Sequence, residues 1–190
     1  MYRVWLWATL WWLPACLAQG AQQAVFAGGS FWVMEALFSD RPGIERVETG
    51  WMQSGPGTAR RQVVRVHYND AMLTYGDLLT LYWQAVDIHD GEGQYCDRGR
   101  EFTPALYVRN ALQLKWARQS RARLALTGER TPAVRILPSA EFEPAASRHQ
   151  DYQARHPLLY FAYRRMCGYP DGGAFSLQPL LTGRSPASGQ

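Results

Sequence analysis

The chain has 190 residues, of which 47% are hydrophobic and 19% charged, and its formal net charge is +4. This length and apolar content favour one globular domain with its own core and argue against an intrinsically disordered chain. The basic residues are nearly all arginines in short, scattered groups. Nucleic-acid binding needs a contiguous basic surface, so we expect no nucleic-acid partner.

The first twenty residues have the pattern of an export signal. Arg3 precedes the apolar run 4–13, and the small residues Ala15 and Ala18 follow it. The apolar run is roughly half of the about 20 residues that a membrane-spanning helix needs. The segment therefore indicates export of the protein and does not indicate a membrane span.

Two interpretations of this leader remain open. Cleavage after Ala18 would make residues 1–18 a signal peptide. Alternatively, Leu13-Pro14-Ala15-Cys16 resembles a bacterial lipobox, which would make residues 1–15 a lipoprotein leader and Cys16 a lipidated first residue. In both cases we expect the mature protein in the periplasm or envelope, with Cys16 lipidation as its only link to a membrane.

Strand-type and helix-type patterns alternate along the rest of the chain. Strand-type segments occur at residues 24–27, 44–51, 62–68, 105–108 and 133–137. Helix-type spacing follows Ser30, which can cap the first helix, and recurs at residues 74–86, 110–126, 148–155 and 158–165. The alternation predicts an α/β (α+β) fold, a mixed sheet with packed helices. We expect one domain over residues 22–170, a loop at 87–101 within it, and a flexible tail at 171–190.

The cysteines outside the leader, Cys96 and Cys167, allow two interpretations. An even pair in an oxidising compartment is a candidate disulfide, whereas two unpaired cysteines would be small buried apolar side chains. The two sulfurs and His149 contain no close-spaced pair of zinc ligands, so we expect no metal site.

A strand, a Gly-Gly turn and a helix start meet at Ser30, where unpaired backbone N–H groups stabilise an anion. Gly28-Gly29-Ser30-Phe31-Trp32 resembles the Gly-Gly-Cys-Phe-Trp signature of the methionine-S-sulfoxide reductases, the methionine sulfoxide reductase A family. Further blocks fit the same family in the same order, namely Pro42-Gly43-Ile44, residues 48–50, 64–68 and 74–79, Gly93 to Gly99, His149 to Tyr152, and Cys167-Gly168. The resemblance spans residues 24–170 and implies the family's two-layer α/β fold.

The resemblance also implies a chemistry and its partners. In this family a cysteine thiolate attacks the sulfoxide sulfur, and a glutamate and two tyrosines protonate the oxygen. A second cysteine condenses with the resulting sulfenic acid, and thioredoxin or another thiol reduces the disulfide. The implied partners are proteins that contain methionine sulfoxide and, for an active enzyme, a thioredoxin-like reductant; no cofactor is implied.

Several of the implied catalytic positions hold other residues. The nucleophile position is Ser30, and a hydroxyl is a far weaker acid than a thiol. Gln62 occupies the position of the proton-donating glutamate and cannot deliver a proton. Phe102 occupies one tyrosine position and lacks the hydroxyl. The loop that carries the other tyrosine is shortened to residues 51–55, with no equivalent residue.

Other implied site residues are retained. Phe31 and Trp32 would form the apolar pocket for the substrate methyl group, or else pack in the core. Asp97 would order the site by hydrogen bonds, or else cap a turn. Cys96 and Cys167 match redox or structural cysteines of one subgroup. We expect Glu35 to face solvent on the first helix.

Three functions follow from this combination. The favoured one is a pseudoenzyme of the reductase family, which binds methionine or its sulfoxide without reducing it. The alternatives are an active reductase that uses Cys96 or Cys167, and a structural envelope module held by a bridge between them. A serine hydrolase is not expected, because Gly29-Ser30-Phe31 lacks the Gly-x-Ser-x-Gly elbow.

Overall fold

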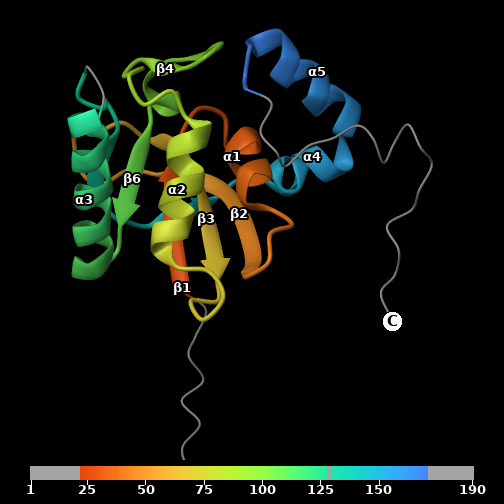
Figure 1. Ribbon diagram of the computed structural model, residues 1–190. Helices are drawn as coiled ribbons and strands as arrows, with labels where there is room; N and C mark the ends of the chain where they lie inside the picture. The colour runs from red at the N-terminus through yellow and green to blue at the C-terminus, as the bar shows by residue number, and fades with distance from the viewer. Residues whose placement is uncertain (1–21, 128–129, 171–190) are drawn as a thin grey trace, which may run out of the picture.

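The computed structural model describes residues 22–127 and 130–170 (Figure 1). A six-stranded sheet has the order β7-β6-β1-β3-β2-β8, in which only β6 and β7 are parallel. Its strands are β1 (Gln22–Ala27), β2 (Ile44–Met52), β3 (Arg61–Tyr68), β6 (Ala105–Val108), β7 (Arg135–Pro138) and β8 (Phe142–Pro144). A separate hairpin contains β4 (Gly93–Gln94) and β5 (Asp97–Arg98). The expected mixed sheet is confirmed.

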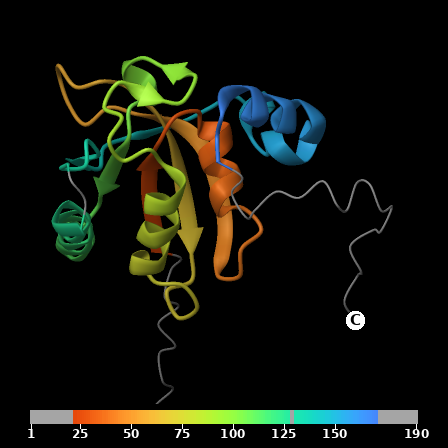
Figure 2. The ribbon, with the colours of Figure 1, turned by 45° about the horizontal axis from the view of Figure 1, so that its top comes forward.

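The described residues contain five helices, of which α1, α2 and α3 lie against the sheet and α4 and α5 lie beside α1 (Figures 1 and 2). They are α1 (Phe31–Phe38), α2 (Tyr75–Ala85), α3 (Ala111–Thr127), α4 (Tyr152–Arg155) and α5 (Pro157–Cys167), with 3-10 turns η1 (Arg100–Phe102) and η2 (Ser147–His149). The expected cap at Ser30 is confirmed, and Thr74 forms a capping box with Asp77 at the start of α2. None of the helices in these described residues is long and apolar enough to cross a membrane.

The strands present two different faces because side chains alternate along each strand. On β1, Ala24 and Phe26 belong to the main core under the helices, where Phe26 stacks on Phe38 of α1 at 4.8 Å. Val25 and Ala27 point to the other face and form a smaller cluster, which includes the partly buried Phe142 of β8. The smaller cluster therefore draws residues from both halves of the sheet.

The sheet curls so that its two edges approach each other. β7 and β8 lie at opposite edges, five strand spacings apart, which is about 24 Å in a flat sheet. Only residues 139–141 connect them, and four residue steps reach at most about 14 Å. The Ser54 hydroxyl, after β2, donates to the Pro138 carbonyl of β7 at 2.6 Å. The face of the sheet that carries the smaller cluster is consequently the inside of a partly closed barrel.

Three expectations about the elements were wrong. The strand expected at 133–137 runs from Arg135 to Pro138. A proline, which has no backbone N–H, is tolerated here because β7 is an edge strand and has no neighbour on its outer side that would need this donor. The helix expected at 148–155 is divided into η2 and α4, because Asp151 has a left-handed backbone with φ of 53°. The loop expected at 87–101 contains the β4–β5 hairpin and the first two residues of η1.

Candidate functional site

Ser30 lies at the junction of β1 and α1, and its side chain is buried. Its hydroxyl oxygen accepts a hydrogen bond from the Trp32 N–H at 3.3 Å, which makes Ser30 the N-cap of α1. Gly29 has φ of 81°, and a Cβ at this position would lie 2.5 Å from the Tyr169 hydroxyl. The glycine is therefore required both by the turn and by the close approach of the C-terminal segment.

Three side-chain oxygens accept hydrogen bonds from the first backbone N–H groups at the start of α1, those of Ser30, Phe31 and Trp32. Besides the Ser30 hydroxyl, the Gln62 side-chain oxygen accepts from the Phe31 N–H at 3.1 Å, and Asp97 Oδ2 accepts from the Ser30 N–H at 3.3 Å. These donors would otherwise be unpaired, because the first N–H groups of a helix have no partner within it. The three expected site residues Ser30, Gln62 and Asp97 are thus brought together.

Asp97 also receives two tyrosine hydroxyls from the C-terminal segment. Tyr163 of α5 and Tyr169 after it both donate to Asp97 Oδ2. Burial raises the pKa of both tyrosines, and the Asp97 charge raises them further, so both stay neutral donors. These two residues were not expected at the site from the sequence, in which only the density of tyrosine between residues 152 and 169 could have indicated them.

Aromatic rings surround the start of α1. Phe31 is buried and makes edge contact with Trp51 at 5.8 Å, and Trp32 stacks on Tyr152 of α4 at 4.0 Å. His149 lies over both, 5.4 Å from the Phe31 ring and 5.7 Å from the Trp32 ring. Such a cluster suits an apolar methyl or thioether group, which packs well against ring edges and faces.

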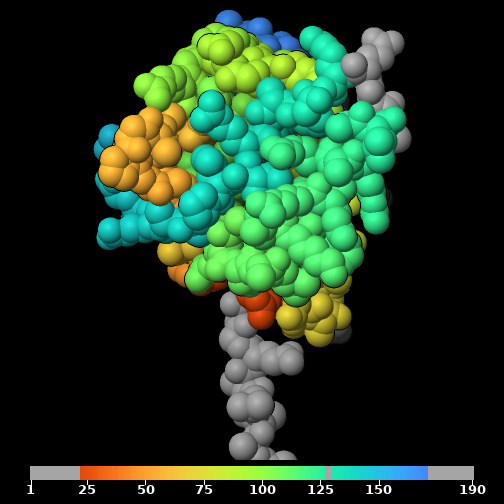
Figure 3. Space-filling model, turned by 90° about the vertical axis from the view of Figure 1, so that its left-hand side faces the viewer, coloured from red at the N-terminus to blue at the C-terminus, as the bar shows by residue number. Residues whose placement is uncertain are grey.

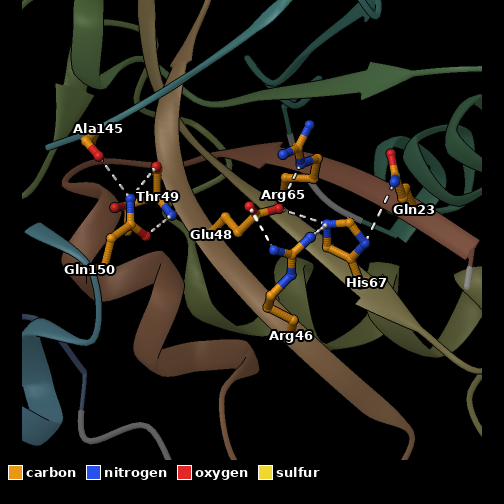
Figure 4. Close-up of polar contacts among 8 residues, drawn as sticks. All are labelled: Gln23, Arg46, Glu48, Thr49, Arg65, His67, Ala145 and Gln150. Carbon is orange, nitrogen blue, oxygen red and sulfur yellow. Dashed lines mark hydrogen bonds and ion pairs between the residues drawn. The ribbon is translucent and has the colours of Figure 1, made fainter. Parts of the chain in front are cut away.

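Hydrogen bonds to β2 hold His149 in this position, and Figure 4 shows those between Thr49 and the neighbouring residue Gln150. The Gln150 side chain pairs with both backbone groups of Thr49 at 2.9 Å, and the Thr49 hydroxyl donates to the His149 carbonyl at 3.3 Å. Burial lowers the pKa of His149, and the charges of Arg148 and Arg155 lower it further. The ring is therefore neutral at pH 7.

Phe102, the residue at the position of a family tyrosine, contributes its backbone carbonyl to the site, which accepts a hydrogen bond from the Gly29 N–H at 3.0 Å.

The two cysteines outside the leader form a disulfide. Cys96, next to Asp97, is bonded to Cys167 at the end of α5, with a Cα–Cα distance of 5.0 Å. The interpretation as two unpaired, buried side chains is wrong, and Cys96 is exposed. The bond fixes α5 and its Tyr163 beside the hairpin that carries Asp97.

Glu35 does not face solvent, contrary to the expectation from sequence. Its carboxylate is buried and accepts from the Asp151 N–H at 2.7 Å and the Tyr152 N–H at 3.0 Å. It therefore ties α1 to α4 and holds Tyr152 against Trp32. The sequence did contain an indication that Glu35 is buried, because Phe31, Glu35 and Phe38 have the spacing of one buried helix face.

We expect Glu35→Gln to change how stability depends on pH. Burial raises the pKa of Glu35 to about 7, from 4.5 as a free side chain, although the two N–H donors oppose this shift. As the pH rises from 4.5 to 7, Glu35 loses its proton in the unfolded chain but keeps it in the folded protein. The protonated Glu35 therefore stabilises the fold fully below pH 4.5, and this stabilisation is lost as the pH rises through 7. The loss is about 3 kcal/mol, since each pKa unit corresponds to about 1.4 kcal/mol.

Urea denaturation from pH 4 to pH 8 measures this effect as the difference between wild type and Glu35→Gln. That difference should change with pH and level off above pH 7 to 8. A constant difference across the range would contradict the assignment of the slope to Glu35.

Comparison with known proteins gives consistent matches to one family. The family model described as peptide methionine sulfoxide reductase matches residues 22–171. The chain is 40% identical over 169 residues to peptide methionine sulfoxide reductase MsrA 2 of Caulobacter vibrioides, which covers 82% of this chain and 85% of that protein. It is 35% identical over 161 residues to MsrA of Bacillus licheniformis, with coverage of 78% and 89%.

Solved structures show the same fold. The reduced form of Mxr1 from Saccharomyces cerevisiae matches with a TM-score of 0.67 and 18% identity, covering 73% of this chain and 87% of that one. Methionine sulfoxide reductase A of Corynebacterium diphtheriae matches with a TM-score of 0.60 and 21% identity, covering 74% and 77%.

Proposed function

Because the chain belongs to the peptide methionine sulfoxide reductase family, we propose that it binds methionine or methionine S-sulfoxide residues of proteins but does not reduce them. The observation that carries this proposal is the chemistry at Ser30, whose hydroxyl caps α1 where the family's reaction requires a thiolate. A hydroxyl cannot pass through sulfenic acid and disulfide. The other two cysteines outside the leader are bonded to each other.

The retained groups support binding. The Phe31 and Trp32 rings, with Tyr152 stacked behind Trp32, offer an aromatic surface to a methyl group and sulfur. The indole Nε1 of Trp32 is a buried donor without a hydrogen-bond partner in the described parts of the chain. A sulfoxide oxygen is an acceptor that could satisfy it, as buried donors generally require.

The replaced groups support the loss of reduction. Gln62 keeps an acceptor for the Phe31 N–H, but its amide cannot donate a proton to a departing oxygen. Phe102 has no hydroxyl, and Tyr163 and Tyr169 use their hydroxyl protons on Asp97. No described group near Ser30 therefore repeats the proton delivery that the family's chemistry implies.

We expect Trp32→Ala to weaken binding of a methionine-S-sulfoxide peptide at least about 10-fold, because it removes the exposed edge of the aromatic surface. Fluorescence anisotropy of a labelled peptide measures the affinity. Trp83→Ala is the matched control, since Trp83 is also partly buried but packs in the main core at α2. No binding of the wild type at millimolar peptide, or equal affinity of both variants and wild type, would contradict the proposal.

Export belongs to the same proposal. The leader and the tail, residues 1–18 and 171–190, lie outside the described residues, and so does Cys16 with its two interpretations. The Cys96–Cys167 disulfide supports a location in the periplasm or envelope, because disulfides persist in oxidising compartments. The domain bounds 22–170 stay a prediction.

The disulfide also bears on the two alternative functions. A reductase that uses Cys96 or Cys167 would first need this bond opened, and only then would a thioredoxin-like reductant become a partner. A structural envelope module is favoured by the same bond and by the burial of Ser30 and Phe31. Peptide binding that depends on Trp32 separates the proposed function from the structural one.

A further inference from the structure

A second candidate binding site lies on the face of the sheet away from the main core. Residues on β3 alternate, so Gln62 and Val64 point toward α1 and the main core, whereas Val63 and Arg65 point into the partly closed barrel. A cavity of about 330 Å³ opens on this inner face. Figure 3 shows residues 130–150 crossing this side of the molecule between α3 and the loop after β2.

Two arginines line the cavity and have donors to spare. Arg65 uses Nε on Glu48 at 2.8 Å, and its terminal nitrogens have no partner among the described residues. Arg109, at the end of β6, is exposed, and within the described chain its guanidinium forms no hydrogen bond or ion pair. The Ser139 hydroxyl, which among the described residues donates only to the Met52 sulfur at 3.8 Å, adds a further donor.

The charge around the cavity is positive. Glu48 is the carboxylate that contacts this cluster, and it is shared by Arg46 at 3.2 Å, Arg65 at 2.8 Å and His67 at 2.7 Å (Figure 4). Although burial favours its neutral form, hydrogen bonds from Arg65 and His67 lower the pKa of Glu48, so it is ionised at pH 7. The charged residues that line the cavity, Arg65 and Arg109, are both positive, and the nearby Glu48 is shared between Arg65 and Arg46.

Apart from Gln23, apolar side chains form the rest of the wall. Val25 of β1 and Met52 of β2 belong to the inner cluster, and Phe142 packs on it under the Arg65 guanidinium, 4.0 Å from the ring centre. Val25 and Met52 are almost fully buried, whereas Phe142 is half-buried and Ala140, which also lines the cavity, is exposed. An inorganic ion such as phosphate would leave Phe142 and Ala140 against water, whereas an organic anion would cover them. Guanidinium groups bind carboxylates through paired, charge-assisted hydrogen bonds.

From these observations we infer that the inner face of the curled sheet binds a small organic carboxylate, with its charged end between Arg65 and Arg109. Its apolar body contacts Phe142 and Ala140. The site is separate from Ser30, because the two lie on opposite faces of β3. The mouth of a barrel is a common place for such sites, since curvature supplies an enclosed apolar wall with polar groups at the rim.

The test uses benzoate, benzamide and inorganic phosphate as probes with the full chain. Titration calorimetry should show benzoate binding at least about 10-fold more tightly than benzamide, which has the same shape without the charge, and than phosphate. Arg109→Gln should weaken benzoate binding at least about 10-fold. The matched control is Arg165→Gln, which removes the same charge from an exposed position on α5 and should leave the affinity unchanged.

Two further measurements keep the result unambiguous. Arg109 is exposed, so its substitution should leave the unfolding transition unchanged, and methionine-sulfoxide peptide binding should be the same in Arg109→Gln and wild type. Equal affinity for benzoate and benzamide, tighter binding of phosphate, or full affinity in Arg109→Gln would each overturn the inference.

Discussion

Wild-type protein is expected to leave a methionine-S-sulfoxide peptide unreduced in dithiothreitol, whereas Ser30→Cys is expected to reduce it. The variant places a thiol at the N-cap of α1, where in the wild type the Ser30 hydroxyl accepts a hydrogen bond from the Trp32 N–H. The positive end of the helix dipole and that N–H both stabilise a thiolate, which is the nucleophilic form. We expect peptide reduction by the wild type not to exceed the rate in buffer alone, and reduction by Ser30→Cys to be measurably faster than that rate.

The proton supply should limit this variant. Gln62 presents its side-chain oxygen to the Phe31 N–H, an interaction that a glutamate would keep while adding an acidic proton. We therefore expect Ser30→Cys/Gln62→Glu to exceed Ser30→Cys by about 10²-fold or more below neutral pH, as a positioned general acid typically contributes. Reverse-phase separation of peptide and reduced product gives both rates.

Controls distinguish this result from unspecific thiol chemistry. Ser39→Cys introduces a thiol at the other end of α1, where the Ser39 hydroxyl donates to the Glu35 carbonyl and the helix dipole disfavours a thiolate. Wild type in the same dithiothreitol reports any activity of thiols released from Cys96 and Cys167. Turnover by wild type would contradict the proposed loss of reduction and support the alternative that uses those cysteines.

Removing the disulfide is expected to produce the largest loss of stability. Cys96 and Cys167 are 71 residues apart, and the chain-entropy description assigns a bond across such a loop about 4 kcal/mol. Cys96 is exposed, so the substitution Cys96→Ser/Cys167→Ser removes little packing there. Denaturant unfolding of the double variant against oxidised wild type measures the difference, and reduced wild type is the matched control.

The same variant should loosen the start of α1. The bond holds α5 beside the hairpin, and Tyr163 and Tyr169 on that segment donate to the Asp97 oxygen that accepts the Ser30 N–H. Hydrogen exchange at Ser30 should therefore become faster when the bond is absent. Unchanged stability together with unchanged exchange would show that the noncovalent contacts of α5 are sufficient.

The local pattern of the sequence determined the start of the site. A strand, Gly28-Gly29 and the capping residue Ser30 predicted the β1–α1 junction, and the motif after it resembled one reductase family. Alternation within the strand-type segment 62–68 places Val64, Val66 and Tyr68 on one face, where the structure buries them. These features were predictable because capping and side-chain periodicity depend on residues within one or two turns of each other.

Only the tertiary structure decided which distant residues meet. Glu35 was expected in solvent, but it accepts hydrogen bonds from residues 116 and 117 positions later in the chain. The pairing of Cys96 with Cys167, the two tyrosines on Asp97, and the cavity between Arg65 and Arg109 arise in the same way. Their physical origin is the curl of the sheet and the packing of α4 and α5 on α1, which no local pattern encodes.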